Sequence, residues 1–268
     1  MKKVLLLFLL FAGFKGYSQD KSIFEYYSLK GSKVDSEKAF FIEKLTQIGD
    51  SLWEIKRFRK SGKLINVRFS LTKKKKQFIG QSITYNDKDS ISAIMFFNKK
   101  GEKHGRYLSW FDDQSKSIEG IFQHNKKEGL WKYYHSNGKI ASRGIYKNDS
   151  IIRGTYFDEQ GNKIPHNLDH CKKEMSFLNG KQKFHDKLQY IVYDLKSLQG
   201  KKIHVNFMVN ANGDITNVYT DELLPINITN KIVNYFEGIK GFSPAIKNHR
   251  RVATKSSIIL NINKGKLK

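Results

Sequence analysis

The residues best suited to bind a metal lie close together near the middle of the chain. The stretch HNLDHC contains His166, Asp169, His170 and Cys171. Imidazole, carboxylate and thiolate groups are the usual ligands of zinc, but zinc sites normally take ligand pairs from two separate segments. No second Cys or His pair faces this one, and Cys171 is the only cysteine, so no intramolecular disulfide can form. We therefore predict no metal site and interpret the stretch as a linker with an incidental thiol.

Sequence motifs of common enzymes are missing from the chain. It contains no G-x-S-x-G nucleophile elbow, no H-E-x-x-H zinc motif and no phosphate-binding P-loop. The eight histidines are scattered singly, and Asp112 and Asp113 lie in a turn-like stretch and not in an acid/base pair. We predict a protein with no catalytic residues and no cofactor.

The composition indicates a folded and strongly basic protein. The 268 residues are 39% hydrophobic and 13% aromatic, and the formal net charge is +24. A solvated lysine-rich surface would explain the charge, and so would attraction to anionic lipid or lipopolysaccharide. We expect no nucleic-acid partner.

The N-terminus has the pattern of a secretory signal peptide. A positive MKK is followed by an apolar run, Val4 to Phe14, and small residues Gly16 and Ser18 precede a cleavage point after Ser18. The run is shorter than the ~20 residues of a spanning helix. We expect residues 1–18 to be removed and the mature chain, without a transmembrane helix, to be exported to the periplasm or cell envelope of a Gram-negative bacterium.

Aromatic residues followed by polar turns recur with a period near twelve. The spacings are 12, 14, 11, 12, 12 and 11 residues between the successive members Tyr85, Phe97, Phe111, Phe122, Tyr134, Tyr146 and Phe157. This period suits one strand plus one tight turn, and the turns are rich in Asn, Asp, Gly and Ser. The pattern predicts an antiparallel meander built from hairpins.

Glycines repeat at twice this interval. Gly105, Gly129 and Gly154 are 24 and 25 residues apart, and Gly120 and Gly144 on the alternate strands are 24 apart. A glycine within a strand leaves room for an aromatic ring from the neighbouring strand. We expect the aromatic side chains to stack along one face of the sheet.

The stretch GLWKYYHSNGKIASRGIY resembles the MORN-like repeats of the YwqK type, with their G-x-W-x-x-Y-x-x-x-G pattern. The resemblance covers residues 24–165 and is strongest in the two central repeats. It implies a non-catalytic sheet used for binding or scaffolding.

The pattern changes beyond Pro165. After a linker, residues 166–174, helical spacing runs from Phe184 to Leu195, two strands flank an NANGD turn, and a second helix ends at Gly238. A long final strand is predicted from Val252 to Ile262. The fold class is therefore mainly β, with a small α+β domain of two helices and three strands over residues 175–264.

This C-terminal order is similar to the TonB C-terminal domain. The resemblance rests on VNANGDI, on Phe242-Ser-Pro-Ala245 and on the closing strand. It implies binding by strand addition, in which an edge strand pairs with an extended segment of a partner such as an outer-membrane receptor. The candidate partner-binding residues are Arg250, Arg251, Val252, Ala253, Lys255 and Ser257.

Two functions remain open at this point. The first is a cell-envelope adaptor that grips a protein segment, associated with TonB-dependent outer-membrane transport. The second is a basic surface-binding protein whose repeats contact anionic lipid or lipopolysaccharide, while the C-terminal domain is structural.

Overall fold

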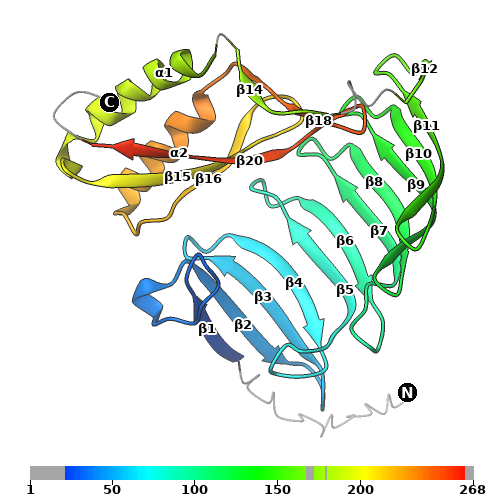
Figure 1. Ribbon diagram of the computed structural model, residues 1–268. Coiled ribbons are helices and arrows are strands. Elements are labelled where there is room, and N and C mark those ends of the chain that lie inside the picture. Colours follow the sequence, from blue (N-terminus) through cyan, green and yellow to red (C-terminus); the bar gives the residue numbers. More distant parts are fainter. Residues whose placement is uncertain (1–21, 167–171, 179, 263–268) are drawn as a thin grey trace, which may run out of the picture.

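A long curved sheet and a smaller unit of helices and strands make up the protein (Figure 1). The computed structural model describes residues 22–166, 172–178 and 180–262. The predicted signal peptide, residues 1–18, lies outside the described residues, as do Asp169, His170 and Cys171. We call strands β1 to β12 the repeat sheet and residues 172–262 the C-terminal unit.

The repeat sheet is an antiparallel meander in which each strand pairs with the next one along the chain. Its strands are β1 (Ser22–Tyr27), β2 (Phe41–Gln47), β3 (Trp53–Arg59), β4 (Leu64–Ser70), β5 (Phe78–Tyr85), β6 (Ile91–Phe97), β7 (Gly105–Trp110), β8 (Lys116–Gln123), β9 (Lys126–Tyr134), β10 (Ile140–Lys147), β11 (Ser150–Phe157) and β12 (Lys163–Ile164). A short 3₁₀ helix, Ser36–Lys38, lies between β1 and β2. The predicted meander is confirmed, because the recurring aromatic residues fall at or next to the strand ends.

Trp131 shows how the aromatic repeat builds one face of this sheet. The indole is 1% exposed, stacks on Tyr107 at 5.9 Å between ring centroids, and meets Phe122 edge-on at 4.9 Å. It also covers Gly120, where an added Cβ would lie 2.2 Å from Trp131 Cδ2. The predicted stacking of rings over strand glycines is confirmed at this position.

The C-terminal unit places two helices on a three-stranded sheet with the order β16-β15-β20. Its main elements are α1 (Gly180–Asp194), β15 (Lys202–Val209), β16 (Ile215–Thr220), α2 (Ile226–Gly238) and β20 (Thr254–Asn261), with a 3₁₀ helix at Lys196–Leu198. Short strands form two further small sheets: β13 (Lys172–Lys173), β18 (Ala245–Lys247) and β19 (Arg250–Val252) in one, β14 (Ser176–Phe177) and β17 (Phe242–Ser243) in the other. No helix of the described part is long and apolar enough to cross a membrane.

The alternation of buried and less buried side chains along β15 explains the core of this unit. Ile203, Val205, Phe207 and Val209 of β15 are buried because they face the helices, whose own buried residues include Leu188 and Phe236. The predicted apolar spacing is confirmed in α1, and the predicted second helix is confirmed as α2, which ends at Gly238. The predicted turn at residues 210–214 is also present, and Gly213 adopts a φ of 89° there against the carbonyl of Phe242.

The predicted strand from Val252 to Ile262 is wrong in its extent. The chain forms β19 up to Val252, leaves strand geometry at Ala253, and resumes as β20 from Thr254. β19 pairs with β18 in a separate sheet, while β20 pairs with β15. The break separates two partners of the chain: Arg250 bonds to Ser117 and Tyr134 of the repeat sheet, whereas β20 pairs with β15.

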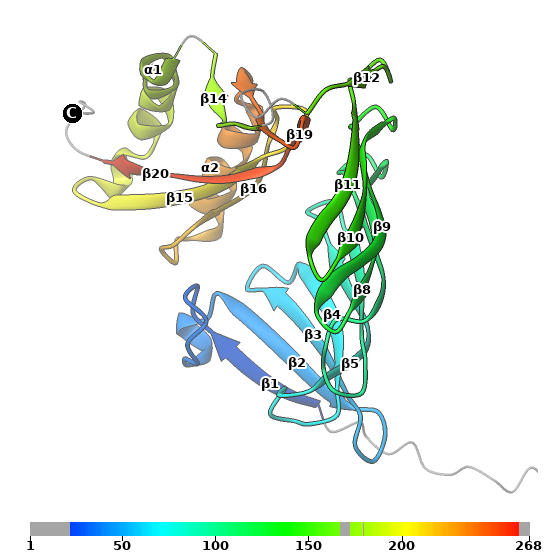
Figure 2. The ribbon, with the colours of Figure 1, turned by 45° about the vertical axis from the view of Figure 1, so that its right-hand side comes forward.

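The C-terminal unit lies on the inner side of the curved repeat sheet (Figures 1 and 2). At one end, Arg251 Nε lies 3.0 Å from Glu159 Oε1. At the other end, the ring of Tyr219 meets the ring of Phe40 at 5.3 Å. The unit therefore contacts both the early and the late strands of the repeat sheet.

A charged cluster fastens the first strands of the repeat sheet. Glu43 is 3% exposed and accepts a hydrogen bond from Lys75 Nζ at 2.6 Å. Glu25 accepts hydrogen bonds from Lys33 Nζ and from the Tyr27 hydroxyl, each at 2.6 Å, and also pairs with Lys75. Burial opposes ionisation of Glu25, but these hydrogen bonds outweigh it and lower its pKa from 4.5 to about 2.

We expect the protein to lose stability in acid because of this carboxylate. A depressed folded-state pKa gives stability that is complete above the unfolded value of 4.5 and is lost as pH falls towards about 2. Thermal unfolding followed by circular dichroism between these two values should show a falling Tm. In Glu25→Gln the Tm should depend less on pH over this range. A variant whose Tm falls as steeply as that of wild type would contradict the role given to Glu25.

Candidate binding site at the edge strand and the interdomain cleft

Strand β20 forms one edge of the C-terminal sheet. Ile262 donates its N–H to Lys201 O and accepts from Gly200 N–H, so its backbone groups point towards β15. These groups alternate in direction along a strand, and the β15–β20 register has no shift. The backbone N–H groups that point away from β15 therefore belong to Lys255, Ser257 and Ile259. No backbone hydrogen bond within the described residues reaches these outward groups.

Two of the predicted partner-binding residues make contacts within the chain. Arg250 is 9% exposed, and its Nη1 donates to Ser117 O, Ser117 Oγ and Tyr134 O, each at 3.1 Å. Its guanidinium lies 5.4 Å from the centre of the Tyr133 ring. Arg251 pairs with Glu159, as described above. Both arginines thus join β19 to the repeat sheet.

The other four predicted residues follow directly along the chain. Val252 ends β19, Ala253 lies between the strands, and Lys255 and Ser257 are exposed on β20. The six residues thus lie within residues 250–257 in two environments. Arg250 and Arg251 contact the repeat sheet, and Lys255 and Ser257 lie on the edge strand β20.

A cleft of about 370 Å³ lies beside β20, between the C-terminal unit and the repeat sheet. The repeat sheet contributes Phe40, Phe41, Arg59 and Ile65. The C-terminal unit contributes Asn206, Phe207, Met208, Asn217, Tyr219, Lys255, Ser256 and Ser257. The lining thus combines aromatic rings, amides, hydroxyls and two cations, and it includes no carboxylate. We call this space the interdomain cleft.

Arg59 and Asn217 are the most distinctive residues of the interdomain cleft. The Arg59 guanidinium lies 5.4 Å from the centre of the Tyr219 ring, and its Nη2 lies 3.7 Å from Asp87 Oδ1. Asn217 has a φ of 57°, and its buried Oδ1 has no hydrogen-bond partner within the described residues. Sequence reasoning missed both residues. An Asn within the strand-like ITNVYT was the available signal, because Asn is depleted in strands.

Two histidines meet near the end of the repeat sheet. His166 Nδ1 lies 3.3 Å from His249 Nε2, and the His166 ring stacks on Tyr156 at 4.5 Å. Within residues 22–166, 172–178 and 180–262, no group of three His, Cys, Asp or Glu side chains could hold a metal ion. The remaining potential ligands of the HNLDHC stretch lie outside the described residues.

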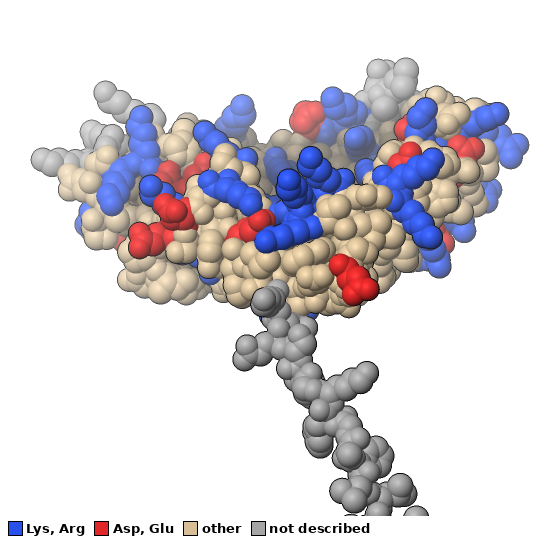
Figure 3. All heavy atoms as spheres, turned by 90° about the horizontal axis from the view of Figure 1, so that it is seen from below, with Lys and Arg blue, Asp and Glu red and all other residues tan. Residues whose placement is uncertain are grey.

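Lys and Arg side chains gather near the middle of the face seen from below, with scattered Asp and Glu among them (Figure 3). The positive charge of the sequence is thus displayed on the surface. The chain matches no model of a known protein family, and the search of curated proteins finds no match either.

Proposed function

We propose that the protein is a non-catalytic, exported adaptor of the cell envelope that captures an extended segment of another protein by β-strand addition. The observation that carries this proposal is the outward-facing edge of β20. A segment that pairs there would satisfy the backbone groups of Lys255, Ser257 and Ile259 and would extend the sheet by one strand. The similarity of the C-terminal pattern to the TonB C-terminal domain supports the same mode and favours a segment of an outer-membrane receptor as the partner.

The architecture also supports an adaptor role. Arg250 holds the start of the 250–257 stretch against the repeat sheet, so the edge of β20 has a fixed position relative to that sheet. An edge held in this way loses little conformational freedom when a partner binds, and preorganisation of that kind favours affinity.

A proline scan of β20 tests the proposal. Ser257→Pro removes an outward N–H and leaves the β15 ladder intact, because proline is tolerated at edge positions whose N–H does not face the sheet. We expect this variant to keep a native circular dichroism spectrum but to capture partner from envelope extract at least about tenfold less well, which corresponds to about 1.4 kcal/mol.

Two controls accompany this variant. Ser257→Ala removes only the hydroxyl and should capture partner normally. Ser256→Pro removes an inward N–H from the ladder with β15 and should destabilise the fold. Equal capture by wild type and by folded Ser257→Pro would count against strand addition.

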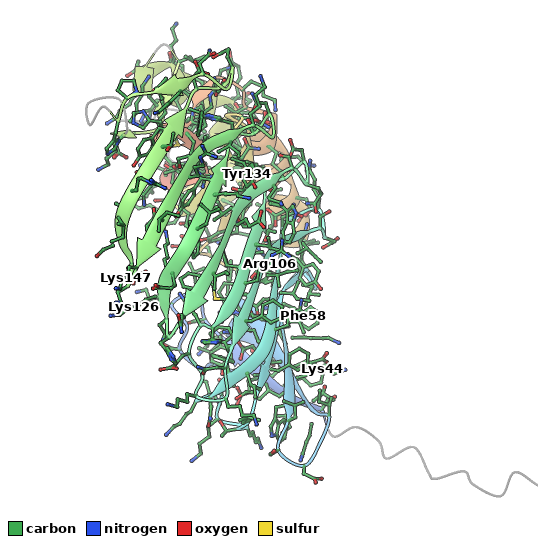
Figure 4. The ribbon with its side chains drawn as sticks, turned by 90° about the vertical axis from the view of Figure 1, so that its right-hand side faces the viewer. Lys44, Phe58, Arg106, Lys126, Tyr134 and Lys147 are labelled. Carbon is green, nitrogen blue, oxygen red and sulfur yellow. The ribbon has the colours of Figure 1, made fainter. Side chains whose placement is uncertain are left out.

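The second candidate function uses the outer face of the repeat sheet. Ile121 and Leu130 are 52% and 44% exposed there, and Arg106 lies directly opposite Ile121 on the neighbouring strand. Figure 4 looks onto this face, with Arg106 labelled on β7 and Tyr134 on β9, on either side of β8. Aliphatic side chains beside cations suit an anionic lipid or lipopolysaccharide surface. Such binding would weaken steeply with ionic strength, whereas strand addition would change little.

A further inference from the structure

The two charged residues that line the interdomain cleft are both cations. Arg59 comes from the repeat sheet and Lys255 from β20, so the two cations stand on different walls. Arg59 pairs with Asp87, at 3.7 Å and outside the lining, and its guanidinium lies 5.4 Å from the centre of the Tyr219 ring. A cleft with two cations and no lining carboxylate attracts an anionic group.

The lining also includes Ser257 of β20, whose hydroxyl can donate a hydrogen bond to a carboxylate. The cleft therefore suits a ligand that carries a carboxylate, as an acidic residue in a polypeptide does.

The side chains of β20 alternate between the helix side of the sheet and the side of the cleft. The side chains of Ile258 and Leu260 lie on the helix side, opposite Val205 and Ile203. Side chains alternate along a strand, so Lys255 and Ser257 lie on the other side, where both line the cleft. A segment paired with the free edge of β20 would place every second side chain on this same side, ~5 Å from its neighbour on β20.

We propose that the interdomain cleft receives the carboxylate of an Asp or Glu side chain from the segment that pairs with β20. This inference rests on the proposed function and names the sequence preference of that segment. Arg59 and Lys255 bind the carboxylate. The repeat sheet thereby contributes to specificity, since Arg59 belongs to β3.

A displayed library of random ten-residue peptides, selected on the full mature chain, tests the inference. Peptides that bind wild type and lose binding to Ser257→Pro identify strand addition. We expect these peptides to be enriched in Asp or Glu at one position, with apolar or small residues at the alternate ones. A synthetic copy of the best peptide and its Glu→Gln or Asp→Asn counterpart then serve as defined probes.

The affinities should form a double-mutant cycle. Arg59→Gln should weaken binding of the acidic peptide about tenfold, a coupling of about 1.4 kcal/mol. It should leave the affinity of the amide peptide unchanged. Lys60→Gln is the control, because Lys60 directly follows Arg59 and is not among the residues that line the cleft. Free glutarate should compete poorly with the acidic peptide, because it lacks the backbone pairing.

The outcomes separate the two proposals. Peptides that are sensitive to Ser257→Pro but show no acidic preference, or no loss with Arg59→Gln, would overturn the carboxylate site and leave strand addition standing. Acidic peptides that bind through Arg59 but ignore Ser257→Pro would overturn strand addition. Glutarate that binds as tightly as the peptide would show a site for a small dicarboxylate, which overturns the peptide assignment.

Discussion

Replacing Trp131 with alanine should destabilise the protein by about 3–5 kcal/mol, the range for truncating a large buried aromatic residue. The indole is almost completely buried, contacts the rings of Tyr107, Phe122 and Tyr133, and donates from Nε1 to the backbone carbonyl of Ile121 at 3.1 Å. Its removal would leave a cavity between strands β8 and β9 and an unpaired carbonyl. Chemical denaturation followed by circular dichroism would measure the loss.

Leu130→Ala is the matched control, because Leu130 precedes Trp131 in the same strand but faces outward and is 44% exposed. A surface change of this kind usually alters stability by less than ~0.5 kcal/mol. Similar losses for both variants would contradict the stacking account.

Gly120→Ala gives an independent test of the same packing. An added Cβ would meet the Trp131 ring at 2.2 Å, so the variant should be destabilised while Trp131 is present. In the Trp131→Ala background the methyl group would fill part of the cavity. The two substitutions should therefore be strongly non-additive.

Local signals in the sequence were sufficient to predict strands β5 to β11 of the repeat sheet. Each aromatic residue is followed by a polar turn, and a meander requires only that neighbours in sequence be neighbours in space. The same applies to α1 and α2, whose apolar spacing is contained within fifteen and thirteen residues. These elements were predictable because the information that specifies them is local.

The cleft and the docked end of β19 could not be predicted in this way. Arg250 bonds to Ser117 across 133 positions of sequence, and Arg59 meets Tyr219 from the opposite end of the chain. An arginine in a basic sequence is normally solvated, so nothing in KNHRRV distinguished a buried guanidinium from an exposed one. The predicted strand failed at Ala253 for the same reason, since a distant contact on β8 and β9 decides where the strand breaks.

The contact between Arg250 and the repeat sheet should decide how firmly the C-terminal unit is held. Its guanidinium donates to two backbone carbonyls and one hydroxyl, and hydrogen bonds from charged donors contribute about 1.5–3 kcal/mol each. Arg250→Met keeps the length of the side chain and its contact with the rings of Phe111 and Tyr133, but it leaves these oxygens without a donor. We expect a stability loss of about 2–4 kcal/mol, since part of the hydrogen-bond energy is offset by the relief of a buried charge.

The loss should be accompanied by a change in shape. With the anchor removed, the C-terminal unit is held by weaker contacts, and small-angle scattering should report a larger radius of gyration and a broader distance distribution. Arg251→Met is the matched control, because its ion pair with Glu159 is largely exposed and such pairs contribute about 0–1 kcal/mol. An Arg250→Met variant that scatters and unfolds like wild type would show that the edge of β20 is positioned by other contacts, and the preorganisation argued for strand addition would then fail.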